Sequence, residues 1–158
     1  MEDPLHLVLV SPQIPPNTGN VARLCAVTGC KLILVEPLGF SISDRDLKRA
    51  GLDYWDKVFV KLFPSYPAYL EAYPDVRRVL FSARAETSIY GHRFQAGEHL
   101  IFGSETRGLP AEILVSAQGV GQAVHLPMLP DRRSLNLSTA VGIATYEALR
   151  QIHHLSSD

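Results

Sequence analysis

The chain has 158 residues, a formal net charge of −1 and a hydrophobic content of 46%. This length fits a single core, so we expect one domain over residues 1–158. The composition excludes a disordered chain, and the near-neutral charge excludes the global basic footprint common in nucleic-acid-binding proteins. No apolar run approaches the roughly 18 residues that cross a bilayer, and no basic leader opens the sequence, so we expect a cytoplasmic protein without membrane contact.

The first third of the chain alternates between two structural patterns. Residues 5–10 and 31–35 are short apolar runs and predict two buried strands. Between them, apolar residues recur at helical spacing, at Val21, Leu24, Cys25 and Thr28. Gly29 stands where that helix should end. This segment therefore predicts a strand–helix–strand unit.

The same alternation continues to the end of the chain. Further strands are predicted over residues 57–62, 78–82, 99–103 and 123–127, and helices over 43–50, 66–73, 110–116 and 138–153. Such alternation favours an α/β fold with a mostly parallel six-stranded sheet flanked by helices. The last helix is apolar around most of its circumference and needs two packing partners. One partner is the sheet, and we expect the second to be another copy of the chain in a homodimer.

Several common site types are excluded. Leu109 and Pro110 stand where a phosphate-binding P-loop needs Lys and Ser or Thr, and Gly119 and Gly121 precede a strand instead of following one as a dinucleotide fingerprint requires. The six histidines are scattered, so we expect no metal site. The two cysteines fit neither a zinc knuckle nor a disulfide framework, and we expect both to be reduced and structural.

Three polar loops are the strongest candidates for a functional site. They are Asn17–Asn20 with Arg23, Gly103–Pro110, and Asp131–Ser138. In a parallel sheet all three leave the carboxyl ends of strands, where open α/β folds bind ligands. The alternative is helix capping, by Asn17 or Asn20 for the first helix and by Asn136 or Ser138 for the last. Capping leaves the arginine that accompanies each loop unexplained.

Basic residues form three further candidate patches for binding phosphate. They are Arg45 with Lys48 and Arg49, Arg77 with Arg78, and Arg132 with Arg133. For any one patch alone, a solvated surface is the simpler interpretation.

These loops also carry a resemblance to a known family. Pro16–Asn20 with Arg23, Phe102–Pro110, and Pro127–Met128 followed by Ser134–Ser138 resemble, in order and spacing, the three motifs of the SPOUT superfamily of RNA 2′-O-ribose methyltransferases. Residues 36–40 and 49–54 resemble in particular the short tRNA (cytidine/uridine-2′-O-)-methyltransferases of the anticodon wobble nucleotide. The likeness covers nearly the whole chain.

The resemblance implies a fold feature and ligands that the patterns alone do not predict. It implies a C-terminal trefoil knot, with the knotted cofactor-binding region at about residues 80–155. The cofactor would be S-adenosyl-L-methionine, without a metal. The partners would be the anticodon stem-loop of tRNA and a second copy of the chain, which would pack through the first and last helices.

The resemblance also assigns roles to individual residues. The expected contacts of the methyl donor are Ala83, Gly103, Leu126 and Ser134. The expected catalytic residues are Arg23, Asn17, Glu105, Ser134 and Asn136. Arg23 would act on the ribose 2′-hydroxyl of the wobble cytidine or modified uridine, either as the base or by holding the adjacent phosphate. Two alternatives remain: the same chemistry on another tRNA position or on ribosomal RNA, and a non-catalytic RNA-binding factor.

Overall fold

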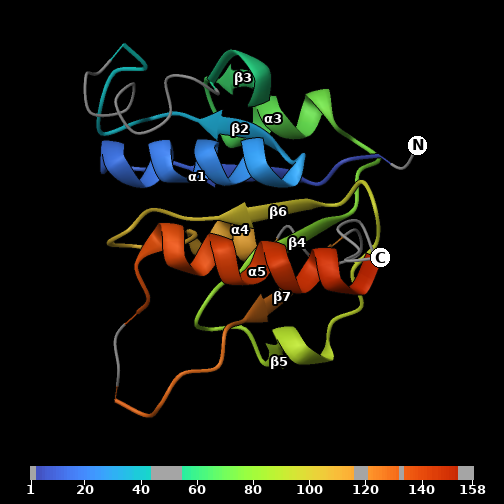
Figure 1. Ribbon diagram of the computed structural model, residues 1–158. Coiled ribbons are helices and arrows are strands. Elements are labelled where there is room, and N and C mark those ends of the chain that lie inside the picture. Colours follow the sequence, from blue (N-terminus) through green and yellow to red (C-terminus); the bar gives the residue numbers. More distant parts are fainter. Residues whose placement is uncertain (1–2, 44–54, 116–120, 132–133, 153–158) are drawn as a thin grey trace.

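A parallel β-sheet crosses the middle of the molecule (Figure 1). The structure is a computed structural model that describes residues 3–43, 55–115, 121–131 and 134–152. The strands are β1 (His6–Val10), β2 (Lys31–Val35), β3 (Phe59–Phe63), β4 (Arg78–Phe81), β5 (Thr87–Ser88), β6 (His99–Phe102) and β7 (Gly121–His125), in the spatial order β3-β2-β1-β6-β4-β7-β5. Every pairing between these strands is parallel, which confirms the predicted fold class.

The sheet has seven strands among the described residues, so the prediction of six was wrong. The additional strand is β5, in which Thr87 pairs with Val124 and Ser88 with His125 of β7. Two residues are too few to produce a recognisable alternation, and this strand exists because it pairs with the edge of β7. It lies between the predicted strands over residues 78–82 and 99–103, where the sequence predicted no element.

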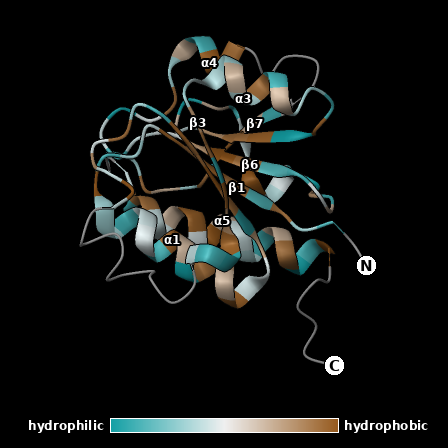
Figure 2. Cartoon of the chain, turned by 90° about the horizontal axis from the view of Figure 1, so that it is seen from above, coloured by the Kyte–Doolittle hydropathy of each residue, from teal (hydrophilic) through white to brown (hydrophobic). Residues whose placement is uncertain are grey.

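Helices cover both faces of the sheet (Figure 2). On one face lie α1 (Pro15–Thr28) and α5 (Leu137–Ile152), which contact each other, and on the other lie α3 (Tyr66–Ala72) and α4 (Ala111–Val115). A short 3₁₀ turn, η1 (Ile89–Gly91), follows β5. Residues 55–58 are helical instead of opening a strand at residue 57. The helix predicted over 43–50 lies, apart from its first residue, outside the described residues.

The ends of α1 show one correct and one wrong prediction. Gly29 ends the helix in the left-handed conformation, with φ of 82°, and its N–H donates to the carbonyl of Cys25. The predicted caps Asn17 and Asn20 are wrong, because the helix begins two residues earlier than Asn17 with Ile14 as its N-cap. At α5, however, Asn136 does act as a cap, since its side-chain oxygen accepts from the backbone N–H of Thr139 at 3.2 Å.

The strands place alternate side chains in two separate cores. Leu7 and Leu9 of β1 pack with α1 and α5, whereas Val8 and Val10 pack with α3 and α4. A strand that is buried on both faces has no polar side, which explains why the sequence shows continuous apolar runs. Cys25 and Cys30 are buried and free, as predicted.

Two polar clusters occupy the amino-terminal end of the sheet. His99 is buried against Tyr69, whose hydroxyl lies 2.7 Å from His99 Nδ1, and burial lowers the pKa of His99 to about 3. The candidate patch Arg77 with Arg78 is not free to bind phosphate. Arg77 pairs with the buried carboxylate of Glu98 at 3.2 Å, and the buried Arg78 donates to the carbonyl of Tyr73.

The remaining sequence predictions about the fold stay open. Arg45, Lys48 and Arg49, and likewise Arg132 and Arg133, lie outside the described residues. The trefoil knot implied by the family resemblance stays a prediction.

Candidate functional site

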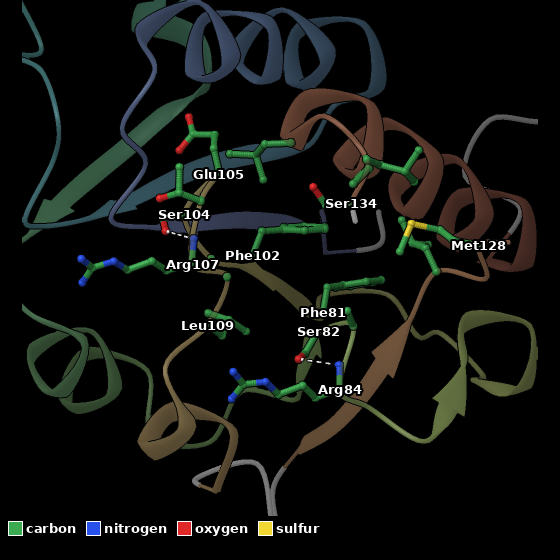
Figure 3. Close-up of a pocket in the computed structure, with 18 residues that line it drawn as sticks. Phe81, Ser82, Arg84, Phe102, Ser104, Glu105, Arg107, Leu109, Met128 and Ser134 are labelled. Atoms are coloured by element: carbon green, nitrogen blue, oxygen red, sulfur yellow. Dashed lines mark hydrogen bonds between the residues drawn. The ribbon is translucent and has the colours of Figure 1, made fainter. Parts of the chain in front are cut away.

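A cavity of about 550 Å³ opens at the carboxyl ends of β4, β6 and β7 (Figure 3). This volume lies within the range of roughly 300–1,000 Å³ that small-molecule sites occupy. Its walls come from residues 81–84 after β4, residues 102–109 after β6, Leu126 and Met128 after β7, and residues 134–140 at the start of α5. The cavity therefore lies at the sheet edge where the sequence predicted that the polar loops would converge, and two of the three loops, those after β6 and before α5, form part of its walls.

One side of the cavity is apolar and rigidly packed. The rings of Phe81 and Phe102, the last residues of β4 and β6, stack with centroids 4.6 Å apart and an interplanar angle of 11°. Leu109, Leu126 and Leu137 extend this apolar lining. Serines, Thr106 and the charged residues Arg84, Glu105 and Arg107 supply the polar part of the wall. Such a lining suits a ligand with a flat ring system and a polar tail.

The loop after β6 folds back on itself to form the cavity mouth. Gly108 donates its N–H to the carbonyl of Ser104 at 2.9 Å, and these two residues form an isolated antiparallel bridge. A Cβ atom at Gly103 would overlap the backbone of Gly108 and Leu109. Gly108 itself has φ of 66°, a conformation that disfavours other residues. The two glycines thus allow the tight return of this loop.

Glu105 connects the mouth of the cavity to the start of α1. Its carboxylate accepts from the backbone N–H groups of Gln13 and Ile14, both at 2.8 Å, and from the side-chain amide of Asn17 at 3.2 Å. The oxygen of that same amide accepts from Asn136 Nδ2 at 3.1 Å. We call Glu105, Asn17 and Asn136 the carboxylate–amide chain. It joins three loops that lie up to 119 residues apart in the sequence.

The structure brings most of the predicted site residues together. Ala83, Gly103, Leu126, Ser134 and Glu105 all line the cavity. Asn17 and Asn136 do not line it and connect to it through Glu105.

Arg23 lies elsewhere. It lines a second, shallower hollow between α1 and α5, together with Asn20, Leu24, Val27, Ser138, Thr139 and Gly142. The N-terminal turns of α5 separate this hollow from the cavity, since Leu137 and Ala140 line the cavity while Ser138 and Thr139 line the hollow.

Sequence reasoning missed several residues of the site. Ser82, Arg84 and Met128 line the cavity, and the backbone of Gln13 and Ile14 holds Glu105. A serine as the last residue of the predicted strand over 78–82 was the available signal for the loop at residues 82–84. No pattern in the sequence pointed to the backbone donors, because any residue type supplies them.

The described residues contain no group of three or more His, Cys, Asp or Glu side chains placed to hold a metal ion. Within the same part of the chain, no helix is long and apolar enough to span a membrane.

The fold and the cavity define an α/β protein with a cavity of small-ligand size at the carboxyl edge of a parallel sheet. Residues 4–146 match the SpoU rRNA Methylase family, and the chain belongs to this family. It is 46% identical over 153 residues to the tRNA (cytidine(34)-2′-O)-methyltransferase of Aeromonas hydrophila, a match that covers 97% of each protein. The family resemblance found in the sequence is thereby confirmed.

Two solved structures extend the comparison. One, on the 2-OH methylation of C/U34 on tRNA, is 51% identical and superposes with a TM-score of 0.87 over 94% of this chain and 96% of that one. The other is the SpoU methyltransferase AviRb from Streptomyces viridochromogenes in complex with the cofactor AdoMet. It is 24% identical, with a TM-score of 0.81 over 96% of this chain and 58% of that one, and shows the shared fold.

Proposed function

We propose that the protein transfers a methyl group from S-adenosyl-L-methionine to the ribose 2′-hydroxyl of the wobble nucleotide of tRNA. The observation that carries this proposal is the cavity itself, because all four residues expected to contact the methyl donor line it. The names of the similar proteins support nucleotide 34 as the target. We further propose that it acts in the cytoplasm, as a homodimer, on the anticodon stem-loop.

The residues of the cavity fit the methyl donor. The stacked Phe81 and Phe102 and the lining leucines suit an adenine ring, and Ser134 with the backbone around Gly103 suits its polar groups. The donor supplies a methyl group already activated on a sulfonium, so the reaction requires no metal. The contribution of the protein is alignment of the hydroxyl with the methyl carbon.

Within one copy of the chain, Arg23 lies outside this cavity. A dimer would instead supply Arg23 from the second copy. The cavity and the Arg23 hollow flank the same turns of α5. A second copy packed on the outer face of α1 and α5 would bring Arg23 of the partner subunit to the cavity mouth. In an isologous dimer the arrangement occurs twice, so each cavity receives one arginine from the other subunit.

The role of Arg23 is to hold the reacting nucleotide. A guanidinium keeps its protons at neutral pH and is therefore a poor base, but it binds phosphate in two parallel hydrogen bonds. Bound to the phosphate beside the ribose, Arg23 would orient the 2′-hydroxyl and favour its developing negative charge. The proton then passes to water.

The carboxylate–amide chain positions this machinery. It fixes the loop at the cavity mouth, the start of α1 and the cap of α5 relative to one another. Because Arg23 lies on α1 and the cavity wall includes the start of α5, the three side chains of the carboxylate–amide chain would set the geometry between donor and acceptor.

A labelling experiment tests the proposed function. Incubation with labelled methyl donor and bulk tRNA, followed by mapping of the modified nucleotide, should place a 2′-O-methyl group at the wobble position. Arg23→Ala should abolish methylation while calorimetry shows nearly unchanged donor binding. Methylation of ribosomal RNA, or of another tRNA position, would overturn the assigned target. Donor binding without methylation of either RNA would overturn the enzymatic function.

A further inference from the structure

Two neighbouring loops at the cavity mouth each contain a serine whose side chain hydrogen-bonds to the backbone of an arginine. β4 and β6 pair in register, and each is followed at the same level by a loop that contains a serine and an arginine. Ser82 Oγ accepts from the backbone N–H of Arg84, and Ser104 Oγ accepts from the backbone N–H of Arg107, both at 3.1 Å. Each serine thus fixes the backbone at which its arginine leaves the loop.

The two arginines present unpaired charge. Both line the cavity and both are exposed. Neither guanidinium has an ion-pair or hydrogen-bond partner within the described ranges of the chain. Figure 3 shows the two guanidinium groups on the same side of the cavity and directed outward from it, while the carboxylate of Glu105 turns toward α1.

Glu105 does not neutralise this pair. It is the one carboxylate in the cavity lining, and its oxygens already accept from Gln13, Ile14 and Asn17. Within the described residues, the mouth therefore carries two cationic groups and one carboxylate whose hydrogen bonds go to the start of α1, which leaves an excess of positive charge. The methyl donor bears a positive sulfonium, so this charge is suited to a different ligand, one that is anionic and approaches from outside.

We propose that Arg84 and Arg107 together bind a backbone phosphate of the RNA strand that contains the reacting nucleotide. A phosphate accepts two or more charge-assisted hydrogen bonds, and guanidinium groups are donors suited to it. The contact would hold the RNA strand on the side of the cavity mouth that faces away from α1. It carries no base specificity, because it is made to the phosphate. This inference rests on the proposed function, because it assumes that RNA is the methyl acceptor.

The test compares two variants in binding and in turnover. The double variant Arg84→Gln with Arg107→Gln keeps polar, hydrogen-bonding side chains and removes both charges. Arg93→Gln is the matched control, since Arg93 is exposed, makes no side-chain hydrogen bond or ion pair within the described part of the chain, and lies in the connection that precedes β6, at the opposite end of the sheet. Binding of an anticodon stem-loop RNA is measured against salt concentration, and donor binding is measured by calorimetry.

We expect the double variant to weaken RNA binding about tenfold and to reduce the slope of log K against log salt by about 0.7, the value for one lost phosphate contact on a single strand. Donor affinity should stay within about twofold, because the lost contact is to the RNA phosphate and not to the donor. The control should match the unaltered enzyme. An unchanged salt slope would overturn the inference, and so would a loss of donor affinity with RNA binding intact, which would assign the pair to the carboxylate of the donor.

Failure of the proposed function gives a different result. Methylation of tRNA by the unaltered enzyme tests the function, whereas only the difference in salt slope between double variant and control tests the arginine pair. An enzyme that methylates tRNA while both variants behave alike would retain the function and refute the inference.

Discussion

At the scale of single residues, Asn17 holds a position that neither an acid nor an apolar side chain can fill. Its amide nitrogen donates to Glu105 and its amide oxygen accepts from Asn136. A carboxamide offers a donor and an acceptor on one small, uncharged planar group. Asn17 is 6% exposed, so water does not readily replace either partner.

Replacing Asn17 should therefore separate lost hydrogen bonding from charge repulsion. Asn17→Ala loses two hydrogen bonds and should lower the free energy of unfolding by about 1–3 kcal/mol. Asn17→Asp, although nearly the same shape, places a second carboxylate beside Glu105 and should be less stable than Asn17→Ala at neutral pH. Chemical denaturation measures both. Asn20→Ala, at an exposed position of the same helix, is the control. An Asp variant as stable as the unaltered protein would contradict the carboxylate–amide chain.

At the scale of elements, the loop between β6 and α4 defines the mouth of the cavity. Its return from Ser104 to Gly108 places backbone directly against the end of β6, at Gly103. The obstacle to a side chain there is main chain, which has no rotamers with which to move aside. The shape of the cavity thus requires glycine at position 103, where no side chain larger than a hydrogen atom fits.

Gly103→Ala should open this loop and remove the donor site. The added methyl group overlaps the backbone of Gly108 and Leu109, so we expect a loss of stability at the upper end of overpacking costs, about 3 kcal/mol, together with loss of donor binding. Gly91→Ala is the control, because the new Cβ there meets only the Thr87 methyl group, at an ordinary contact distance of 3.8 Å. Thermal unfolding and donor calorimetry report the two effects. Unimpaired donor binding by Gly103→Ala would contradict the assigned cavity.

The elements also show how far sequence reasoning reaches. Residues 5–10 and 31–35 predicted strands correctly because strands buried on both faces are apolar throughout, and Gly29 predicted the helix end because a left-handed cap favours glycine. β5 was not predicted because its two residues form a strand only by pairing with β7, and two residues show no pattern of their own.

The site was predictable to a similar extent. Polar loops after parallel strands predicted that residues such as Gly103 and Ser134 would meet at one cavity, which they do. The hydrogen bonds from Asn17 to Glu105 and Asn136 were not predictable, since spacing along the chain says nothing about which side-chain atoms meet. The position of Arg23 in a separate hollow likewise depends on how α1 packs against α5.

At the scale of the whole molecule, α1 and α5 form a layer that is apolar on both of its sides. Val141, Ala144, Ala148 and Leu149 are buried against the sheet and α1. On the outer side, Val27, Ile143 and Tyr146 are 61%, 44% and 51% exposed. A helix with apolar residues in both directions is typical of a subunit interface, and the same outer side carries the hollow that contains Arg23.

The proposed dimer makes a testable link between assembly and activity. Ile143→Glu places a charge in the middle of the outer face and should convert the dimer to a monomer, as measured by light scattering. Because each cavity would then lack Arg23 of the partner subunit, methylation should fall at least about a hundredfold, while donor binding, which uses one subunit's cavity alone, persists. Val60→Glu is the control, since Val60 is 42% exposed on the edge strand β3, remote from the α1–α5 layer.

Mixed dimers test the link without destroying the interface. Arg23→Ala keeps an intact cavity but supplies no arginine, and Leu126→Trp fills the cavity but keeps Arg23. If Arg23 acts across the interface, subunit exchange between these two inactive variants should restore about a quarter of the unaltered activity, because half of the dimers are mixed and each mixed dimer has one complete site. If Arg23 acts within its own subunit, every mixed dimer lacks a complete site and activity stays at the level of the separate variants. That second result would remove the need for a dimer in catalysis, even if light scattering shows one.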